Sequence, residues 1–336
     1  RGRPDKDYAG WLVPPAPRAL PFTVGAASLD PRGRVVVAGS LARDLSLGRF
    51  AYEPAVGRLT ASGSPDRSFG SKGVAVIGTV GDGFVASVRA DQQRILAASR
   101  LSGPSGRLVL AAFRTDGSPD VGYTPAGVTA LPVVPGASAP VLDGADGALF
   151  AFGTVFAPPG KQLVLARYGA SGTLRSDFGT HGVVRSRLLA DADSVLPTGA
   201  QQAPLLVARA DRRTGTVTIA RLTADGALDP SFGVHGIARI RLGTAPVDAS
   251  LARLPGGGVA AVAGIRGALA ASVLDRFGRP ARSFGAGGVQ CLAFGGDSEL
   301  PAVFRPIAAA GDRGLTVAAT VRESDTNDIT VARFRW

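Results

Sequence analysis

The two histidines of the chain are the first residues to test for chemistry. His181 and His235 each precede a glycine, in the tripeptides Thr-His-Gly and Val-His-Gly. Two imidazoles could bind zinc, but a zinc site needs three or four ligands, and no third ligand stands near either histidine. We therefore expect both to occupy one kind of exposed turn, with no metal between them. With no other histidine in the chain, a Ser-His-Asp or Cys-His nucleophile would have to use one of these two.

Aspartate recurs at one position of a repeated pattern, at Asp5, Asp66, Asp120 and Asp229. Calcium needs six to eight oxygen atoms around one point, whereas equivalent positions of successive repeats are spread apart. Such an aspartate more readily accepts backbone N–H groups within a turn. We therefore expect a structural role, which agrees with the replacement of this residue by arginine and alanine in two further copies.

Other residues that could build a catalytic or metal site are scarce. Glutamate occurs only at Glu53, Glu299 and Glu323, and asparagine only at Asn327. The single Cys291 excludes an internal disulfide and a cysteine-based zinc site, and we expect it to be a buried, inert thiol. The motifs GxSxG, HExxH and CxxC are absent. This inventory predicts no metal and no cofactor, and it favours a binding protein over an enzyme.

Arginine gives the chain its formal net charge of +11. Three arginines, Arg89, Arg253 and Arg305, fall in apolar segments, and they are the only candidate ligand-binding residues. If they reach the mouth of a channel they would form a cationic site for an anionic ligand; alternatively, they end strands and point to water. The remaining arginines are scattered, without basic runs or interleaved aromatic residues, which disfavours nucleic acid. The expected partner is a protein or a glycan, which could be anionic.

A repeated pattern must position these residues. Its five copies begin at Leu59, Phe113, Tyr168, Leu222 and Leu274, the fourth reading "LTADGALDPSFGVHGIARI". In each copy an aromatic residue follows a glycine by six positions, and a second glycine follows the aromatic by four. Val or Ile comes next. Such self-similarity at a fixed period indicates a repeat architecture.

A sixth copy is split across the two ends of the sequence. Joining "RFRW" at the C-terminus to "RGRPDKDYAG" at the N-terminus aligns Gly2, Asp5 and Tyr8 with the glycine, aspartate and aromatic of the other copies. The six glycine-to-glycine steps range from 52 to 61 residues and together equal the chain length. A closed ring of repeats explains why the glycine spacing continues from the C-terminus to the N-terminus. We expect a strand at about 4–13 to complete a sheet formed by about 302–335.

Short apolar runs within the repeats predict strands. They begin near residues 34, 94, 148, 204, 258 and 315, and their continuous hydrophobicity indicates burial on both faces. Each repeat of about 56 residues accommodates four strands, the size of one propeller blade. The sequence therefore predicts an all-β, six-bladed β-propeller with four antiparallel strands per blade, in a single domain over residues 1–336.

Turn signals set the order of strands within a blade. The Asp-Gly turn should join the third and fourth strands, so that the segment with the aromatic and Gly-Val forms the outermost strand. The opposite order, with Gly-Val innermost, remains open. The apolar run at 254–274 is long enough for a membrane, but its glycines, its proline and Arg266 favour two buried strands. No transmembrane segment is predicted.

The unit "DG(S/A)LDPSFGxxGV" resembles the delta-60 repeat, a bacterial β-propeller repeat of unknown function, and more distantly six-bladed NHL propellers. The resemblance implies a secreted or cell-envelope protein of bacteria without an assigned reaction. We expect any N-terminal targeting segment to have been removed. The expected function is a non-enzymatic binding scaffold; the alternative is an enzyme that uses an axial pocket on an anionic sugar or lactone.

Overall fold

The computed structural model describes residues 22–44, 50–78, 82–102, 107–123, 125–132, 134–136, 139–142, 149–197, 204–293, 302–311, 314–323 and 326–334. Regular structure in these ranges is almost entirely strand, which confirms the all-β class. The helical segments described are two short 3-10 turns, η1 (Pro125–Gly127) and η2 (Pro255–Gly257). Across the same ranges, no helix is both long enough and apolar enough to span a lipid bilayer.

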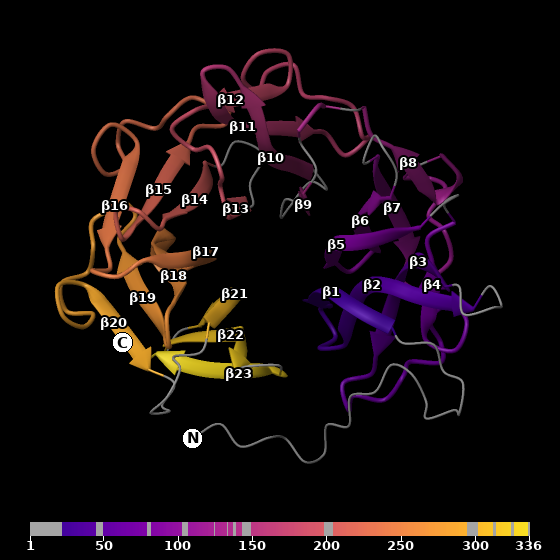
Figure 1. Cartoon of the computed structure of the whole chain (residues 1–336). Coiled ribbons are helices and arrows are strands. Elements are labelled where there is room, and N and C mark those ends of the chain that lie inside the picture. The colour runs from indigo at the N-terminus through magenta and orange to yellow at the C-terminus, as the bar shows by residue number, and fades with distance from the viewer. Residues whose placement is uncertain are drawn as a thin grey trace. The chain divides into compact units, whose positions relative to one another are not determined.

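Two compact units make up the chain, and Figure 1 labels their strands. Unit 1 comprises residues 1–153, 165–176 and 180–183, and unit 2 comprises residues 154–164, 177–179 and 184–336. Unit 1 holds two four-stranded sheets: β1 (Phe22–Leu29), β2 (Val35–Asp44), β3 (Phe50–Leu59) and β4 (Val74–Val76); and β5 (Gly83–Ala90), β6 (Arg94–Leu101), β7 (Leu108–Arg114) and β8 (Val128–Ala130).

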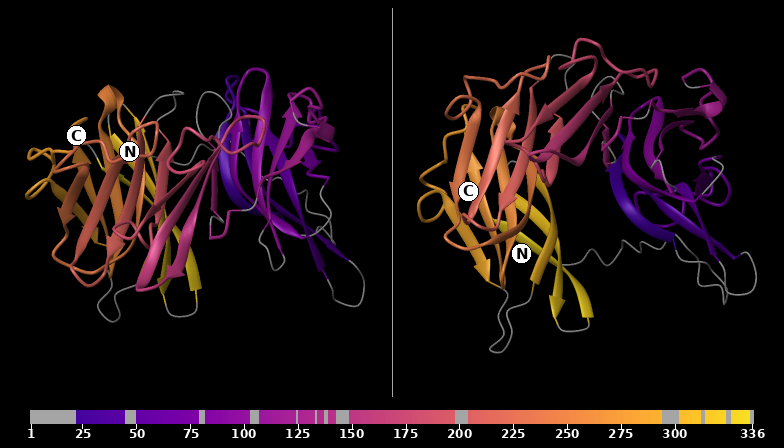
Figure 2. Two further views of the ribbon diagram at one scale, coloured as in Figure 1. Left: turned by 90° about the horizontal axis from the view of Figure 1, so that it is seen from above. Right: turned by 45° about the horizontal axis from the view of Figure 1, so that its top comes forward.

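A third four-stranded sheet contains the division between the units, and three further sheets lie in unit 2. The third sheet is formed by β9 (Ala139–Leu142), β10 (Leu149–Ala157), β11 (Gly160–Tyr168) and β12 (Val183–Ser186). Those of unit 2 are β13 (Ser194–Pro197), β14 (Leu205–Asp211), β15 (Thr216–Leu222) and β16 (Ile237–Arg241); β17 (Pro246–Arg253), β18 (Val259–Ile265), β19 (Ala268–Leu274) and β20 (Val289–Ala293); and β21 (Ala302–Gly311), β22 (Gly314–Glu323) and β23 (Thr326–Phe334). Figure 2 shows the same sheets from two other directions.

The strand order confirms the expected position of the Asp-Gly turn. Each of the six apolar runs is the second strand of its sheet, and in the fourth copy the turn at Asp225-Gly226 lies between the third strand, β15, and the fourth, β16. One detail of the prediction is wrong. The aromatic residue is not in the fourth strand, because its backbone N–H bonds to the aspartate carbonyl three residues earlier, at 3.1 Å for Phe232. The fourth strand begins only after the second glycine.

Burial on both faces, predicted from the apolar runs, is clearest in β18. All seven of its residues are buried. Val259, Ala261 and Ala263 point into the core shared with the β13–β16 sheet, while Ala260 and Val262 point into the core shared with the β21–β23 sheet. Successive side chains of a strand point to opposite faces, so one strand can serve two cores. The apolar run at 254–274 thus forms two buried strands, β18 and β19.

A contact between successive copies explains the spacing between glycine and aromatic. The N–H of the glycine after the aromatic donates to the carbonyl of the residue before the next copy's turn glycine, from Gly70 to Asp116 at 2.7 Å. The same bond runs from Gly179 to Asp225 at 2.6 Å and from Gly233 to Phe277 at 2.7 Å. A Cβ on Gly278 would meet the ring of Phe232 at 2.8 Å, so the two copies are in direct contact. The motif therefore joins one sheet to the next.

Candidate functional site

Both histidines occupy the exposed turn position that the sequence predicts. His181 and His235 are exposed and have φ of 53° and 52°, each followed by a glycine with φ near 89°. Paired residues with φ above zero form the two-residue hairpin turn that matches the twist of the strands. Bridges between Thr180 and Val183 and between Val234 and Ile237 close these hairpins. Each histidine thus belongs to the hairpin turn that directly precedes the fourth strand of its sheet.

Purified protein should carry no stoichiometric zinc or nickel bound between His181 and His235. Each ring stands in a hairpin turn, and the described residues contain no group of three His, Cys, Asp or Glu side chains that could hold a metal. Metal analysis after mild dialysis tests this expectation. A metal that disappears when both histidines are changed to alanine would contradict it.

The recurring aspartate has the predicted structural role in two copies. Asp66 accepts the N–H of Ser68 at 3.0 Å, and Asp229 accepts the N–H of Ser231 at the same distance. Burial alone would raise the pKa of Asp66, but hydrogen bonds from Ser68 and the charge of Arg58 together lower it. Asp5 lies outside the described residues.

An arginine partner of this aspartate was not predicted. Arg58 is only 2% exposed, and its Nε donates to Asp66 Oδ2 at 2.8 Å. Its guanidinium lies over the ring of Phe69, 4.6 Å from the centroid, and Nη1 also donates to the carbonyl of Thr115 in the next copy. Arg221 repeats these contacts with Asp229, Phe232 and Arg276. The signal was present in the sequence, because the arginine precedes the aspartate by eight residues in both copies.

Cys291 is exposed, so the expectation of a buried thiol is wrong. It lies in β20, the fourth strand of its sheet, where the three residues 291–293 are all exposed. The error has a physical cause. Cys291 stands three residues after the second glycine, a position that is exposed in other copies too, at Val76 and Arg239. An apolar run does not show which of its residues point outward.

The three candidate arginines lie on first strands, as expected. Arg89 is half-buried in β5 of unit 1, and Arg253 ends β17 in unit 2. The exposed Arg253 donates from Nη2 to the carbonyl of Pro197 at 2.7 Å, which ties β17 to the preceding first strand. Arg305 is placed in β21 by its backbone alone. Their role in ligand binding stays a prediction.

Four other charged side chains gather near the start of β13 and β17 in unit 2. Asp193 directly precedes β13, and its Oδ2 accepts the backbone N–H of Ala210 at 2.6 Å. The charges of Asp248, Arg209 and Arg212 all act on this carboxyl. We call Asp193, Asp248, Arg209 and Arg212 the Asp193 cluster.

Backbone carbonyls position the two guanidiniums of the cluster. Arg209 donates from Nη1 to Leu188 at 3.3 Å, and Arg212 donates from Nη2 to Val247 at 3.3 Å. Arg209 Nε is a buried donor without a hydrogen-bond acceptor among the described residues. The guanidinium of Arg209 also pairs with Asp211, from Nη2 to Oδ2 at 3.6 Å.

Asp193 has an unusual pKa. Burial of the carboxyl raises its pKa to about 7, and the like charge of Asp248 adds to this effect. The hydrogen bond from Ala210 and the two arginines oppose the increase. The residue as a whole keeps solvent access, since its carboxyl is turned toward β14 while the rest remains exposed. A carboxyl that is half protonated near neutral pH can both donate and accept a proton, which is typical of functional sites.

The sequence contains a weak signal for the two carboxyls of this cluster but none for its two arginines. Asp193 and Asp248 stand in "DADSVLP" and "PVDASLARLP", and their numbers differ by 55 (248 minus 193), which is one repeat period. Both are acids at the start of a first strand. Arg209 and Arg212 come from the adjacent β14 and its turn, so only the folded sheet shows that they join the pair.

A family model described as "Domain of unknown function (DUF5122) beta-propeller" matches residues 206–232, from β14 to the aromatic of the fourth copy. This match supports a β-propeller, and its segment includes Arg209 and Arg212 of the Asp193 cluster. No curated protein matches the chain.

Solved structures similar to the chain have low identity to it. The sialidase of Trypanosoma rangeli in complex with the inhibitor DANA is 11% identical with a TM-score of 0.47, over 94% of this chain and 55% of the sialidase. The chain therefore spans about half the length of that protein. A subtype N11 neuraminidase-like protein of A/flat-faced bat/Peru/033/2010 is 8% identical with a TM-score of 0.47, over 93% and 87%. Prolyl oligopeptidase B of Galerina marginata is 12% identical with a TM-score of 0.44, over 93% and 40%.

Replacing Asp193 with asparagine should stabilise the protein at pH 8 and leave it unchanged below pH 4. A carboxyl whose pKa is raised on folding favours the unfolded state progressively as pH rises from its unfolded pKa, near 4, to its folded pKa, about 7. Solvent screening at this accessible residue reduces the gain to about 1 kcal/mol, or roughly 2–4 °C in Tm. Thermal melts between pH 4 and pH 8 measure it.

Asp191→Asn is the matched control for this prediction. Asp191 is also exposed and pairs with Lys161 at 3.1 Å on the surface. Its replacement removes this ion pair and should therefore give no stabilisation at pH 8. Equal pH profiles for the two variants would contradict the assignment to Asp193.

Proposed function

We propose that this chain is a non-enzymatic binding scaffold, and that the Asp193 cluster holds its ligand, an acidic glycan. The observation that carries the proposal is the gathering of two guanidiniums and two carboxyls at the start of adjacent first strands. Guanidiniums bind carboxylates in a forked geometry, and carboxyl oxygens accept hydrogen bonds from hydroxyls. A sugar that carries both groups can pair its carboxylate with the exposed guanidinium of Arg212 and donate a hydroxyl to the carboxyl of Asp193.

Calorimetric titration with an oligogalacturonate, and with a neutral oligosaccharide of the same length, tests the proposal. The acidic oligomer should bind, and Arg212→Ala should weaken its binding at least about tenfold, as expected for a charge-assisted contact. Arg213→Ala is the matched control, because Arg213 is the next residue and its side chain is exposed. Equal binding of both oligomers, or equal effects of the two arginine variants, would overturn the proposal.

The pKa of Asp193 gives the proposal a pH dependence. Protonation below about pH 7 removes a negative charge next to the ligand carboxylate. An acidic glycan should therefore bind more tightly at pH 6 than at pH 8, and Asp193→Asn should abolish this difference.

An enzyme acting on an anionic sugar or lactone is the second candidate, favoured by the same carboxyl. Asp193, with its pKa near 7, could act as general acid or base beside Asp248. Incubation of the oligogalacturonate with the protein distinguishes the two functions. New reducing ends that disappear in Asp193→Asn would establish an enzyme in place of a scaffold.

For the architecture, we propose that the six sheets are the six blades of one closed propeller over residues 1–336, built from delta-60 repeats. The five four-stranded sheets and one three-stranded sheet of the described residues support this count. A strand at about 4–13 would complete the sheet of residues 302–335. A circular permutant that joins Trp336 to Arg1 should still fold. We further propose a secreted or cell-envelope location in bacteria, with Arg89, Arg253 and Arg305 at the mouth of the channel.

A further inference from the structure

A groove lies beside the β17–β18 and β19–β20 turns, at one end of the β17–β20 sheet in unit 2. It has a volume of about 480 Å³. Its lining residues include Leu254, Gly258, Val273 and Ala281, together with Arg276 and Phe277 of the turn between β19 and β20. We call this space the Phe277 groove.

Strand register shows which residues of the β1–β4 sheet correspond to those of the Phe277 groove. Counted from Val35 and Val259, β2 pairs with β1 and β3 in the same register in which β18 pairs with β17 and β19. Ala281 and Asp66 correspond because each donates its N–H to the carbonyl eight residues earlier, at 2.8 Å and 2.9 Å. The equivalent positions are therefore Asp30 and Leu254, Arg34 and Gly258, Arg58 and Val273, and Asp66 and Ala281.

Charged side chains occupy these positions in the β1–β4 sheet. Arg34 donates from Nε to Asp30 Oδ2 at 2.6 Å, and its Nη1 lies 3.4 Å from Asp66 Oδ2. Arg58 donates from Nε to the same oxygen of Asp66 at 2.8 Å. In the β17–β20 sheet a leucine, a glycine, a valine and an alanine replace these four residues. The Phe277 groove thus lies where small or apolar residues replace an ion-pair network.

The turn beside the groove also departs from the repeat. Its tip reads Ala-Ser-Gly at 61–63 and at 170–172, but Arg-Phe-Gly at 276–278. Phe277 is 41% exposed. The guanidinium of Arg276 lies over its ring, 4.7 Å from the centroid, and that of Arg279 lies 5.8 Å from the same centroid. The fifth copy therefore places an aromatic ring and two guanidiniums where two other copies have small residues.

The exposed charge of this turn is positive. Asp275 is its acidic residue, and Oδ1 of Asp275 accepts the N–H groups of Phe277 at 2.8 Å and Arg279 at 2.9 Å. The backbone of the turn thus engages the carboxylate, whereas the side chains of Arg276 and Arg279 are exposed. An apolar groove beside exposed guanidiniums is complementary to a ligand with an apolar body and an anionic end.

We propose that the Phe277 groove binds a medium-chain fatty acid. The alkyl chain lies against Leu254, Val273 and Ala281, and the carboxylate pairs with the guanidinium of Arg276. This site is separate from the Asp193 cluster and takes a different class of ligand, so the proposal goes beyond the glycan-binding function.

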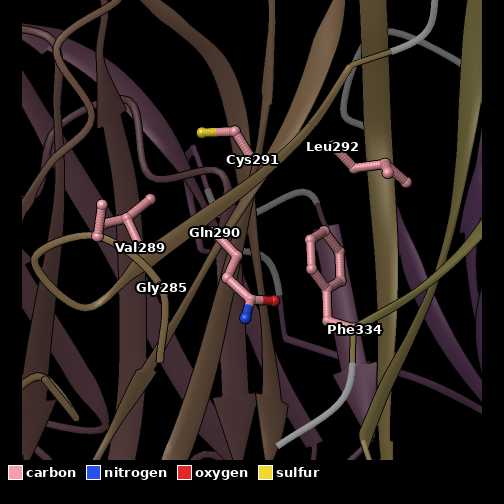
Figure 3. Close-up of a pocket in the computed structure, with 7 residues that line it drawn as sticks. Gly285, Val289, Gln290, Cys291, Leu292 and Phe334 are labelled. Atoms are coloured by element: carbon pink, nitrogen blue, oxygen red, sulfur yellow. The ribbon is translucent and has the colours of Figure 1, made fainter. Parts of the chain in front are cut away.

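A second groove of unit 2 provides an internal comparison. It has a volume of about 550 Å³, and Figure 3 shows Gln290, Cys291, Leu292 and Phe334 among its lining residues. Among the described residues that line it, none is charged. This second groove therefore offers no partner to a carboxylate, and Cys291 can report whether a ligand enters it.

NMR titration with octanoate, and with octanol as its uncharged counterpart, tests the proposal. Octanoate should bind at least about threefold more tightly than octanol, as expected for an exposed ion pair. Val273→Arg/Ala281→Asp rebuilds the pair that Arg58 and Asp66 form, so it should fill the groove and abolish binding of both ligands. Equal affinities of the parent protein for octanoate and octanol would overturn the proposal.

Two further variants separate the carboxylate contact from general surface charge. Arg276→Ala should weaken octanoate binding about threefold and leave octanol binding unchanged. Arg282→Ala is the matched control, because Arg282 is an exposed arginine of the same copy that does not line the groove. Equal effects of the two variants on octanoate binding would contradict the pairing with Arg276.

Arg276→Ala/Phe277→Ser keeps the test decisive if the filled groove fails to fold, because it gives the turn that two other copies carry. It should weaken octanoate binding at least about tenfold through loss of both charge and apolar contact. Octanoate should leave the rate at which a maleimide labels Cys291 unchanged. Unaltered binding by this variant, or protection of Cys291 by octanoate, would overturn the proposal. Neither result bears on the glycan titration, so the two proposals can fail separately.

Discussion

Replacing Asp66 with alanine should lower the free energy of unfolding by about 3–5 kcal/mol, because the guanidinium of Arg58 would remain buried without its counter-charge. Arg58 is 2% exposed, and the distance from its Nε to Asp66 Oδ2 is 2.8 Å. The variant also loses the hydrogen bond that Asp66 accepts from the N–H of Ser68. Chemical denaturation at pH 7 measures the loss.

The chain itself supplies the matched control for this prediction. In the fifth copy the positions of Arg58 and Asp66 are occupied by Val273 and Ala281, so the repeat also folds with an apolar pair. The double variant Arg58→Val/Asp66→Ala should therefore recover more than half of the loss. Burial of an ion pair adds little beyond an apolar pair, whereas burial of one charge alone is costly. A double variant as unstable as Asp66→Ala would show that the arginine's contacts with Phe69 and Thr115 dominate instead.

The ion pair between Arg58 and Asp66 should stabilise the protein less in acid. The pKa of Asp66 is lowered in the folded state, so its contribution is complete above the unfolded pKa of about 4 and is lost as pH falls through the folded value. The difference in the free energy of unfolding between the parent protein and Asp66→Ala should therefore decrease below pH 4.

Strand order within the sheets could be predicted because it depends on local pattern. Continuous apolar runs such as "GVAAVAG" can be satisfied only by a strand with two buried faces, which β18 has. Glycine and aspartate spacing identified the turn between third and fourth strands. The position of Phe232 differs from the prediction because its N–H bonds to the Asp229 carbonyl three residues earlier, so a local turn stands where the pattern indicated the start of the outermost strand.

Charged sites were harder to predict because they join residues from different strands. The Asp193 cluster takes one carboxyl from each of two successive sheets and both arginines from β14 and its turn. The pKa of Asp193 depends on burial and on Asp248, which lies one repeat away in sequence. Exposure of Cys291 has another origin: an apolar run does not show which residues of the fourth strand point outward.

Gly117→Ala should destabilise the protein by about 1–3 kcal/mol more than Gly33→Ala, through crowding at the contact between copies. Gly117 has φ of +86°, and a Cβ there would lie 2.5 Å from the backbone nitrogen of Gly70. That nitrogen donates to the Asp116 carbonyl at 2.7 Å, so the methyl group would force apart two hydrogen-bonded backbone segments. Backbone atoms cannot change rotamer to make room, which leaves displacement of the turn as the only relief.

The comparison with Gly33→Ala separates this crowding from the backbone strain of a positive φ. It has φ of +73°, and no atom lies within 4 Å of the place that a Cβ would take, so alanine there meets the conformational penalty alone, about 1–2 kcal/mol. Both substitutions also restrict the unfolded chain equally, and this contribution cancels in the comparison. Denaturant midpoints of the two variants therefore measure the contact between copies directly. Equal losses would show that the bond from Gly70 to Asp116 does not hold the two sheets together, and that the repeated glycine serves only the turn.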